Sequence, residues 1–254
     1  MNTKMIVTDL DGTLLRSDKT ISGYTASVFD RCRKAGIKIV FATARPVRAV
    51  TNWLNINIKS DACIYHNGAV IRIGDELFQE TGIENDIVNK LLGVIKELDG
   101  IKAAVEINDA LYANFDASTV WPGVEYTTSD FYCLPKLSAD KIIFITADNT
   151  EIGKIERLFG KELYWEISEN EVLMVMNKEA RKRNAARLLA EHFGVMMSEV
   201  AAFGDDYNDV EMLRDSGAGV AVANAIDEAK AAADYICDTN DNDGVAKWLE
   251  GNVL

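Results

Sequence analysis

The chain of 254 residues is long enough for one large domain or two ordinary ones, and its 48% apolar and 26% charged residues are typical of a folded globular protein. Its formal charge of −13 argues against nucleic-acid binding, which depends on a basic surface. No apolar run approaches the roughly 20 residues that a membrane helix needs, so we expect no membrane partner.

The first residues lead directly into an apolar segment, without the charged and apolar regions of a signal peptide. The four cysteines are widely scattered and lack the close spacing of a zinc site or a disulfide scaffold. We therefore expect a cytoplasmic protein with reduced, mostly buried thiols at Cys32, Cys63, Cys133 and Cys237.

The first third of the chain alternates strand and helix signals. Ser22 can cap a helix that runs to about Ala35, and Gly36 fits the position just beyond its end. Pro46 suits the first turn of a second helix. The expected strands are Lys4–Thr8, Ile37–Ala42 and Ala62–Tyr65. Such alternation predicts an α/β fold, a doubly wound parallel sheet with helices on both faces.

The pattern changes at about Thr81 and stays different to about Asn177. Here we expect helices over 84–98 and 150–159, and strands near 103–107, 111–114, 142–146, 163–167 and 172–176. Residues 115–137 have no clear pattern. Strand pairs separated by helices indicate a separate α+β layer.

The alternation of strand and helix signals returns at Glu179. A helix is expected to reach His192, followed by strands at 200–203 and 218–222. The sequence therefore predicts a Rossmann-like core domain, residues 1–81 and 178–254, with an α+β domain inserted at residues 82–177.

Two carboxylates follow the first expected strand in the segment Asp9-Leu10-Asp11-Gly12-Thr13. Ligands bind at this carboxyl edge of parallel sheets. The two side chains can share a divalent cation, while one acts as a nucleophile and the other moves a proton. An ordinary turn is the competing interpretation of Asp-Gly-Thr.

Further polar residues follow two other expected strands. Thr43 and Arg45 follow the second strand, where a hydroxyl can donate to a phosphoryl oxygen or simply cap a helix. Asp205, Asn208 and Asp209 follow the strand at 200–203. Carboxylates so close together repel one another unless a cation lies among them, and their oxygen atoms suit Mg²⁺. A solvated acidic loop is the competing interpretation.

In their order along the chain, these segments resemble the motifs of the haloacid dehalogenase superfamily. They are Asp9-x-Asp11-Gly12-Thr13, Thr43, a lysine before a helix, and Gly204-Asp205-x-x-Asn208-Asp209. The place of the insertion, the segment Asn67-Gly68-Ala69 and the ending Asp243-Gly244-Val245-Ala246 resemble the Cof-like branch, which carries a large α/β cap (subclass IIB). The resemblance covers nearly the whole chain.

The resemblance implies a phosphatase that works through an aspartyl-phosphate. Asp9 would attack phosphorus, and Asp11 would protonate the leaving oxygen and then activate water. Thr43 would hold a phosphoryl oxygen, and Lys182 would neutralise charge beside Asp9. We prefer Lys182 to Lys178 by its spacing to the apolar residues of the next helix, although two arginines flank it where the family usually has small residues.

The resemblance also implies a cofactor, Mg²⁺, and a set of binding residues. The metal set is Asp9, Asp11 through its backbone carbonyl, Asp205 and Asp209, with Asn208 and Asp209 orienting the ligands directly or through water. The substrate-binding set is Thr43, Arg45, Asn67, Gly68 and Asn208. Mg²⁺ and Lys182 would supply the local positive field that an anionic substrate needs in an acidic protein.

Three alternatives remain for the function. A phosphomutase of the same superfamily shares these motifs and differs in transferring the phosphoryl group back to the substrate. A signalling receiver domain is half this size, and its phosphorylated Asp follows the third strand, where this chain has His66-Asn67. A binding protein without activity conflicts with the presence of each expected side chain. We expect a small phosphorylated metabolite, such as a sugar phosphate, as substrate and a monomer or weak homodimer.

Overall fold

A computed structural model describes residues 2–54, 56–96, 101–145, 157, 159–168 and 172–254. The chain divides into two compact units, which we treat separately. The core unit consists of Met1–Gln79 and Arg181–Leu254, and the inserted unit consists of Glu80–Ala180.

The core unit is built on a sheet whose described strands lie in the order β14-β13-β12-β1-β2-β3-β4-β5. The strands from β14 to β3 are parallel, and β4 runs antiparallel to β3. The bounds are β1 Met5–Asp9, β2 Lys38–Ala42, β3 Ala62–Tyr65, β4 Val70–Ile73, β5 Glu76–Glu80, β12 Val200–Gly204, β13 Ala218–Val222 and β14 Tyr235–Cys237.

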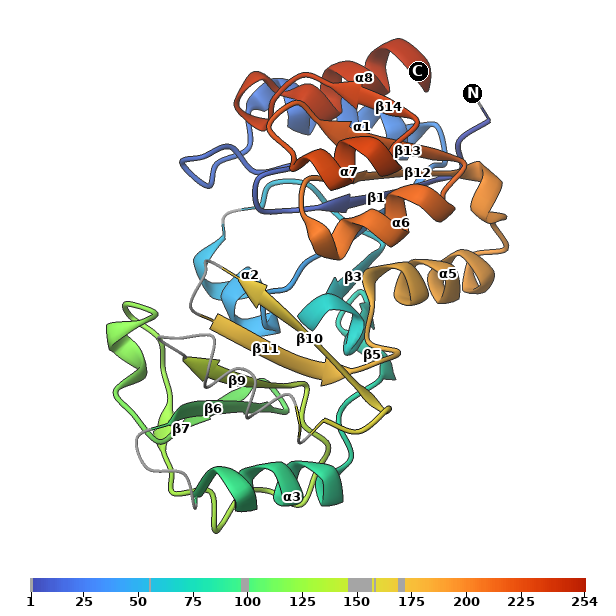
Figure 1. Cartoon of the computed structure of the whole chain (residues 1–254). Coiled ribbons are helices and arrows are strands. Elements are labelled where there is room, and N and C mark those ends of the chain that lie inside the picture. The colour runs from blue at the N-terminus through green and yellow to red at the C-terminus, as the bar shows by residue number, and fades with distance from the viewer. Residues whose placement is uncertain (1, 55, 97–100, 146–156, 158, 169–171) are drawn as a thin grey trace. The chain divides into compact units, whose positions relative to one another are not determined.

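Helices cover both faces of this sheet (Figure 1). α1 packs against α8 on one side, while α6 packs against α5 and α7 on the other. The bounds are α1 Gly23–Lys34, α2 Val47–Trp53, α5 Lys182–His192, α6 Val210–Asp215, α7 Asp227–Ala232 and α8 Gly244–Asn252. The side chain of Ser22 accepts a hydrogen bond from the backbone of Thr25 and so caps α1.

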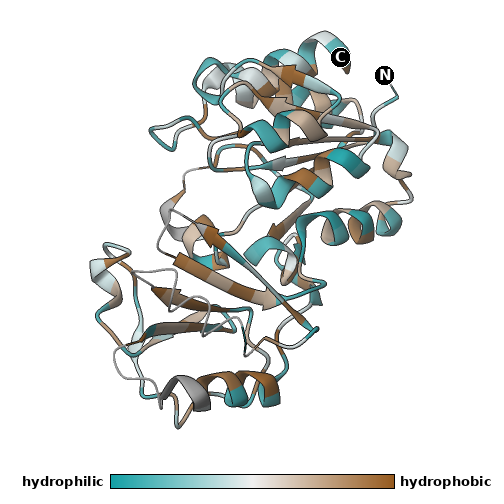
Figure 2. Ribbon diagram, in the orientation of Figure 1, coloured by the Kyte–Doolittle hydropathy of each residue, from teal (hydrophilic) through white to brown (hydrophobic). Residues whose placement is uncertain are grey.

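β1 lies at the point where the chain changes direction across the sheet. From β1 the chain proceeds to β2 and β3 on one side, whereas β12, β13 and β14 follow on the other side. All five residues of β1 and all five of β12 are buried, and Figure 2 shows the strands of this sheet as largely hydrophobic. A ligand site is expected at the carboxyl ends of the strands at such a switch point.

The inserted unit contains a mainly antiparallel sheet in the order β10-β11-β9-β6-β7-β8. Its helix α3 packs against one face through Val88, Leu91 and Leu92, and the segment from Phe115 to Tyr126 packs against Ala104 and Ile143. The bounds are α3 Asn85–Lys96, β6 Lys102–Ile107, β7 Ala110–Ala113, β8 Thr127–Thr128, β9 Lys141–Ile145, β10 Leu163–Ser168 and β11 Val172–Asn177.

The predicted α/β fold class is confirmed, and most expected elements occur within one or two residues of their predicted bounds. The helix predicted over 150–159 falls largely outside the described residues. Two helix starts were wrong: α5 begins at Lys182 instead of Glu179, and Pro46 is the residue before α2 instead of part of its first turn. Ala180 N donates to Asn177 O, which closes a turn before α5 begins.

β4 and β5 were not predicted. For β5 the reason is that all five residues are exposed at the sheet edge and form no apolar face. The four cysteines are free thiols, of which Cys32 and Cys237 are buried and Cys133 is exposed, so the prediction of mostly buried thiols was only partly right. Within the described part of the chain, the helices are too short or too polar to span a bilayer.

Candidate active site

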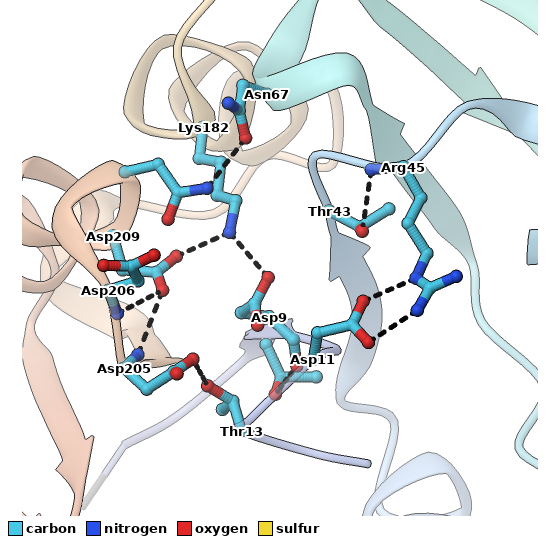
Figure 3. Close-up of polar contacts among 12 residues, drawn as sticks. Asp9, Asp11, Thr13, Thr43, Arg45, Asn67, Lys182, Asp205, Asp206 and Asp209 are labelled. Atoms are coloured by element: carbon cyan, nitrogen blue, oxygen red, sulfur yellow. Dashed lines mark hydrogen bonds and ion pairs between the residues drawn. The ribbon is translucent and has the colours of Figure 1, made fainter. Parts of the chain in front are cut away.

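The predicted site residues lie at the carboxyl edge of the core sheet. Asp9 is the last residue of β1, Thr43 directly follows β2, Asp205 directly follows β12, and Lys182 is the first residue of α5. Because β2, β1 and β12 are neighbours in the sheet, their carboxyl ends bring residues more than 190 positions apart in the sequence together. Figure 3 shows the resulting cluster.

Lys182 is the centre of this cluster. Its ammonium Nζ lies 2.6 Å from Asp9 Oδ1 and 2.8 Å from Asp209 Oδ1. The residue is 1% exposed, and both of its carboxylate partners are also buried. Burial disfavours the charged form of Lys182, but Asp209 and Asp9 raise its pKa above the ordinary value. The lysine therefore carries a fixed positive charge beside Asp9.

Both carboxylate oxygens of Asp209 accept hydrogen bonds. Oδ1 accepts the bond from Lys182, and Oδ2 accepts from the backbone N–H of Asp205 at 3.0 Å and of Asp206 at 3.2 Å. A Cβ at Gly204 would lie 2.4 Å from Cβ of Asp209, so only glycine permits this approach. Asp209 thus fixes both the lysine and the backbone that leads into Asp205.

Three carboxylates converge tightly enough to hold a metal ion. One oxygen each from Asp9, Asp205 and Asp209 lies within 4.8 Å of the others, and Thr13 Oγ1 donates to Asp205 Oδ1 at 2.6 Å. The single ammonium of Lys182 leaves two negative charges of the three carboxylates unbalanced. An oxygen-ligated divalent cation such as Mg²⁺ fits both the donor type and the missing charge.

The pKa values of two of these carboxyl groups reflect burial and, to a smaller extent, the crowding of negative charge. Burial raises the pKa of Asp205 to about 6, and the neighbouring Asp209 adds to this shift. Burial also raises the pKa of Asp9 above its usual range, with contributions from Asp209 and Asp205, while Lys182 acts in the opposite direction. A bound cation would reverse these shifts, because it favours the ionised carboxylates.

Gly12 lets the backbone pass directly beside Asp205. Its φ is +79°, in the left-handed region, and a Cβ there would lie 2.3 Å from Asp205 Oδ2. Any other residue would therefore be both strained and in collision with a candidate metal ligand. The glycine of the Asp-Gly-Thr segment is required by this approach.

Asp11 lies on the other side of Asp9 from Asp205 and Asp209 (Figure 3). Arg45 binds its carboxylate with two bonds, from Nε to Oδ2 at 2.6 Å and from Nη2 to Oδ1 at 2.8 Å, and Lys19 Nζ lies 2.8 Å from Oδ1. Burial alone would raise the pKa of Asp11, but the bonds from Arg45 and Lys19 lower it. In the structure, Arg45 therefore binds the carboxylate of Asp11.

The remaining predicted residues surround the same edge. Thr43 is buried, and its Oγ1 accepts a bond from the backbone N–H of Arg45 at 3.1 Å. Asn67 is buried in a left-handed conformation, and its Oδ1 accepts from Asn208 Nδ2 at 2.9 Å. Gly68 packs against the backbone of Arg181, where a Cβ would lie 2.7 Å from the carbonyl oxygen.

The structure brings all the predicted core residues to one edge. Lys178, the rejected lysine, belongs to the inserted unit, where its N–H donates to Glu162 O. Sequence reasoning missed several contacts of these residues, including those of Thr13 with Asp205, of Lys19 with Asp11 and of Arg45 with Asp11. The adjacency of Thr13 to Gly12 could have suggested the first, whereas nothing in the polar segment around Lys19 indicated the second.

A parallel α/β unit whose carboxyl edge gathers carboxylates around a buried lysine defines a class of enzymes that act on an anionic group. Comparisons with known proteins specify this class. A family profile described as haloacid dehalogenase-like hydrolase matches residues 6–249. The chain belongs to the haloacid dehalogenase-like hydrolases, and the predicted family is confirmed.

Three similar proteins illustrate the relationship. A Bacillus subtilis 5-amino-6-(5-phospho-D-ribitylamino)uracil phosphatase is 31% identical, over 99% of this chain and 96% of the relative. The solved structure of a phosphatase of this superfamily from Bacteroides thetaiotaomicron is 26% identical, with a TM-score of 0.87 over 98% of this chain and 94% of the other. A subclass IIB sugar phosphatase, 24% identical, shares the fold with a TM-score of 0.84 over 98% of each chain.

The enzyme class follows from this family and from the names of its members: the chain is a phosphatase of the haloacid dehalogenase type. Family membership also excludes the receiver-domain alternative.

Proposed function

We propose that the protein hydrolyses small phosphomonoesters with Mg²⁺, through an aspartyl-phosphate on Asp9. The observation that carries this proposal is the contact of Lys182 with both Asp9 and Asp209, next to a carboxylate cluster that can hold a cation. A carboxylate that attacks a phosphoryl group needs nearby positive charge, because both reactants are anionic.

Asp9 is the nucleophile in this proposal. Lys182 orients its carboxylate through Oδ1, at 2.6 Å, and reduces the repulsion between Asp9 and the incoming phosphoryl group. Attack by an oxygen of Asp9 forms the acyl phosphate and breaks the bond from phosphorus to the leaving oxygen. Asp209 keeps Lys182 in place from the opposite side.

Asp11 is the general acid and base. It donates a proton to the leaving oxygen and then accepts one from the water that hydrolyses the acyl phosphate. Arg45 and Lys19 favour its anionic form, which suits the second step. The first step requires the protonated acid, so we expect the contact with Arg45 to loosen when the substrate binds.

Asp9, Asp205 and Asp209 and the backbone carbonyl of Asp11 would hold Mg²⁺. The cation, when bound, neutralises charge on the phosphoryl oxygens. Thr43 would donate its hydroxyl to a phosphoryl oxygen. Arg45, Asn67, Gly68 and Asn208 complete the proposed substrate-binding set, in which Arg45 acts mainly through Asp11.

The substrate class is a phosphate ester of a sugar or a similar small metabolite, as in the relatives named above. We propose that the inserted domain, residues 82–177, is a cap that selects the leaving group, and that residues 1–81 and 178–254 carry the chemistry. The cytoplasm, where such metabolites occur with Mg²⁺, is the proposed location.

A panel of phosphorylated metabolites assayed for released phosphate tests this function. We expect turnover of several sugar phosphates with Mg²⁺ and loss of turnover in EDTA. Full activity in EDTA would contradict the metal assignment. Isomerisation of a sugar phosphate without release of free phosphate would favour the phosphomutase alternative instead.

A further inference from the structure

The loop between β1 and α1, residues 10–22, carries Asp11 and Lys19 and has little regular structure of its own. Leu15 N donates to Leu10 O at 2.8 Å, and Arg16 N donates to Thr20 O at 3.0 Å. These two bonds shape the loop locally but do not attach it to the sheet. Besides the bonds of Asp11 with Arg45 and of Thr13 with Asp205, its attachment comes from a segment near the C-terminus.

Two asparagines, Asn224 and Asn240, connect two carbonyl groups of this loop. Asn224 Nδ2 donates to Gly12 O at 2.8 Å, and Asn240 Nδ2 donates to Leu15 O at 2.9 Å. The backbone N–H of Asn240 donates to Asn224 Oδ1 at 3.0 Å. We call this pair the asparagine bridge. Asn240 is buried, so its amide cannot readily exchange Leu15 for water.

Acidic residues next to the bridge hold the outer part of the same loop. Asp241 accepts two bonds from Ser17, each 2.8 Å long. Asp243 pairs with Arg16, with a distance of 2.7 Å between Nη2 and Oδ2, and accepts from Thr25 Oγ1 at 3.0 Å. The ending Asp243-Gly244 of the sequence motif therefore anchors the loop that follows the nucleophile strand.

The bridge acts at the glycine of the loop. Gly12 has a positive φ, and glycine permits conformations that other residues do not, so its peptide groups need an external constraint. The peptide before Gly12 contains the carbonyl of Asp11, and the peptide after it contains the carbonyl that Asn224 binds. Because both ends of the Asn224 amide are bonded, its orientation is fixed.

We propose that Asn224 and Asn240 are positioning residues for the magnesium site: they fix the Gly12 backbone and thereby direct the Asp11 carbonyl toward the cation. This inference rests on the proposed function, in which that carbonyl is a Mg²⁺ ligand. It assigns a role to two amides that contact neither the carboxylate cluster nor Lys182 in the bonds described above.

The test compares Asn224→Ala and Asn240→Ala with Asn252→Ala. Asn252 is the matched control, because its Nδ2 donates to a backbone carbonyl, that of Trp248, at 2.9 Å but within α8. Calorimetric titration with Mg²⁺ in the absence of substrate should give a Kd about tenfold higher in both bridge variants, in the range typical of groups that orient metal ligands. The control should match the wild type.

Steady-state kinetics should show the same difference between the bridge variants and the control. At limiting Mg²⁺ the bridge variants should lose about tenfold in kcat/KM, and saturating Mg²⁺ should restore most of the loss. Because the two amides form one relay, the double variant should be less impaired than the product of the single effects. An unchanged Mg²⁺ Kd in both single variants would overturn the inference, even if their Tm fell.

Amide hydrogen exchange of residues 11–16 provides a readout that does not depend on metal. Both bridge variants should exchange faster there than the wild type and Asn252→Ala, and unchanged exchange would refute the inference. A wild type that binds no Mg²⁺ would instead refute the proposed function, so the two failures are distinguishable.

Discussion

Both units bury carboxyl groups, but in different surroundings. In the core unit, Asp9 and Asp209 bond the ammonium of Lys182. In the inserted unit, Asp140 and Glu106 are buried beside each other, where Asp140 N donates to Glu106 O at 2.8 Å. Burial, with the charge of Glu106, raises the pKa of Asp140 to about 7.

The difference shows that burial alone does not identify a reactive carboxylate. Asp140 directly precedes Lys141, the first residue of β9, so its neighbouring cation is the adjacent residue in the sequence, in an antiparallel sheet. The core carboxylates come from separate segments and meet one lysine at the carboxyl edge of parallel strands. Convergence of this kind costs stability through desolvation, and the proposed function of these residues in catalysis would account for it.

The largest expected effect concerns Asp9, the proposed nucleophile of the core cluster. Asp9→Asn should reduce kcat by at least about 10³-fold, because an amide of the same shape cannot form the acyl phosphate. Circular dichroism should show an unchanged fold. A variant that keeps more than about a tenth of wild-type kcat would show that Asp9 is not the nucleophile.

Removal of the ammonium group of Lys182 should affect both activity and stability. Lys182→Met should lower kcat by about 10²–10³-fold. It should also lower the free energy of unfolding by about 3–5 kcal/mol, since two buried carboxylates lose their partner. Steady-state kinetics and urea denaturation measure the two effects.

Lys178→Met is the matched control for Lys182→Met, at a lysine four residues away in the inserted unit. Its kcat should stay within a few-fold of the wild type. Its free energy of unfolding should change by no more than about 0.5 kcal/mol, as is usual for surface substitutions. Equal losses in both lysine variants would mean that the cluster around Lys182 has no special role.

Substitution of Arg45 should have an intermediate effect, because its hydrogen bonds are to Asp11 and its charge acts on Asp9 only from a distance. Arg45→Ala should lower kcat by about tenfold, and Arg45→Lys should recover only part of this, since lysine cannot replace the two-bond contact. A large rise in KM with unchanged kcat would show that Arg45 binds the substrate directly.

The smallest expected effect concerns Asp140 in the inserted unit. It should appear in the stability of that unit and not in activity. Because the pKa of Asp140 is above its unfolded value, the folded state binds more protons between about pH 4 and pH 7. The inserted unit should therefore lose stability as pH rises through this window and stay at the lower value above pH 7.

Asp140→Asn should abolish this slope and stabilise the unit at pH 8 by about 1–3 kcal/mol. Hydrogen exchange of the β6 and β9 amides at pH 5 and pH 8 measures it, with corrections for intrinsic rates, and the exposed Asp130→Asn serves as control. A slope that persists in Asp140→Asn would assign it to another group. Activity with Mg²⁺ should remain close to wild type.

Much of the core could be predicted from sequence, because parallel strands buried on both faces give continuous apolar runs that end in polar residues. Asp9, Thr43 and Asp205 follow such runs directly. The edge strand β5 could not be found, because all five of its residues are exposed. For Lys182, spacing to the next apolar residues selected the residue, but only the fold shows that its ammonium reaches Asp9.

Contacts between distant loops also could not be predicted from the sequence. Neither Asn224 nor Asn240 belongs to a pattern that points to Gly12 or Leu15, over 200 residues away. The bidentate contact of Arg45 with Asp11 depends on the path of two loops and on side-chain rotamers. Such contacts follow from tertiary packing, which local propensity does not determine.

The most direct test of the central claim is detection of phosphate on Asp9. The Asp11→Asn variant should accumulate the acyl phosphate, because it lacks the base that activates water. Rapid acid quench after mixing with Mg²⁺ and an activated aryl phosphate, which needs no acid to leave, followed by mass spectrometry of the peptide containing residues 5–16, should show a phosphoryl group on Asp9. Unmodified Asp9 during steady turnover of this variant, or a phosphoryl group on another residue, would contradict the account.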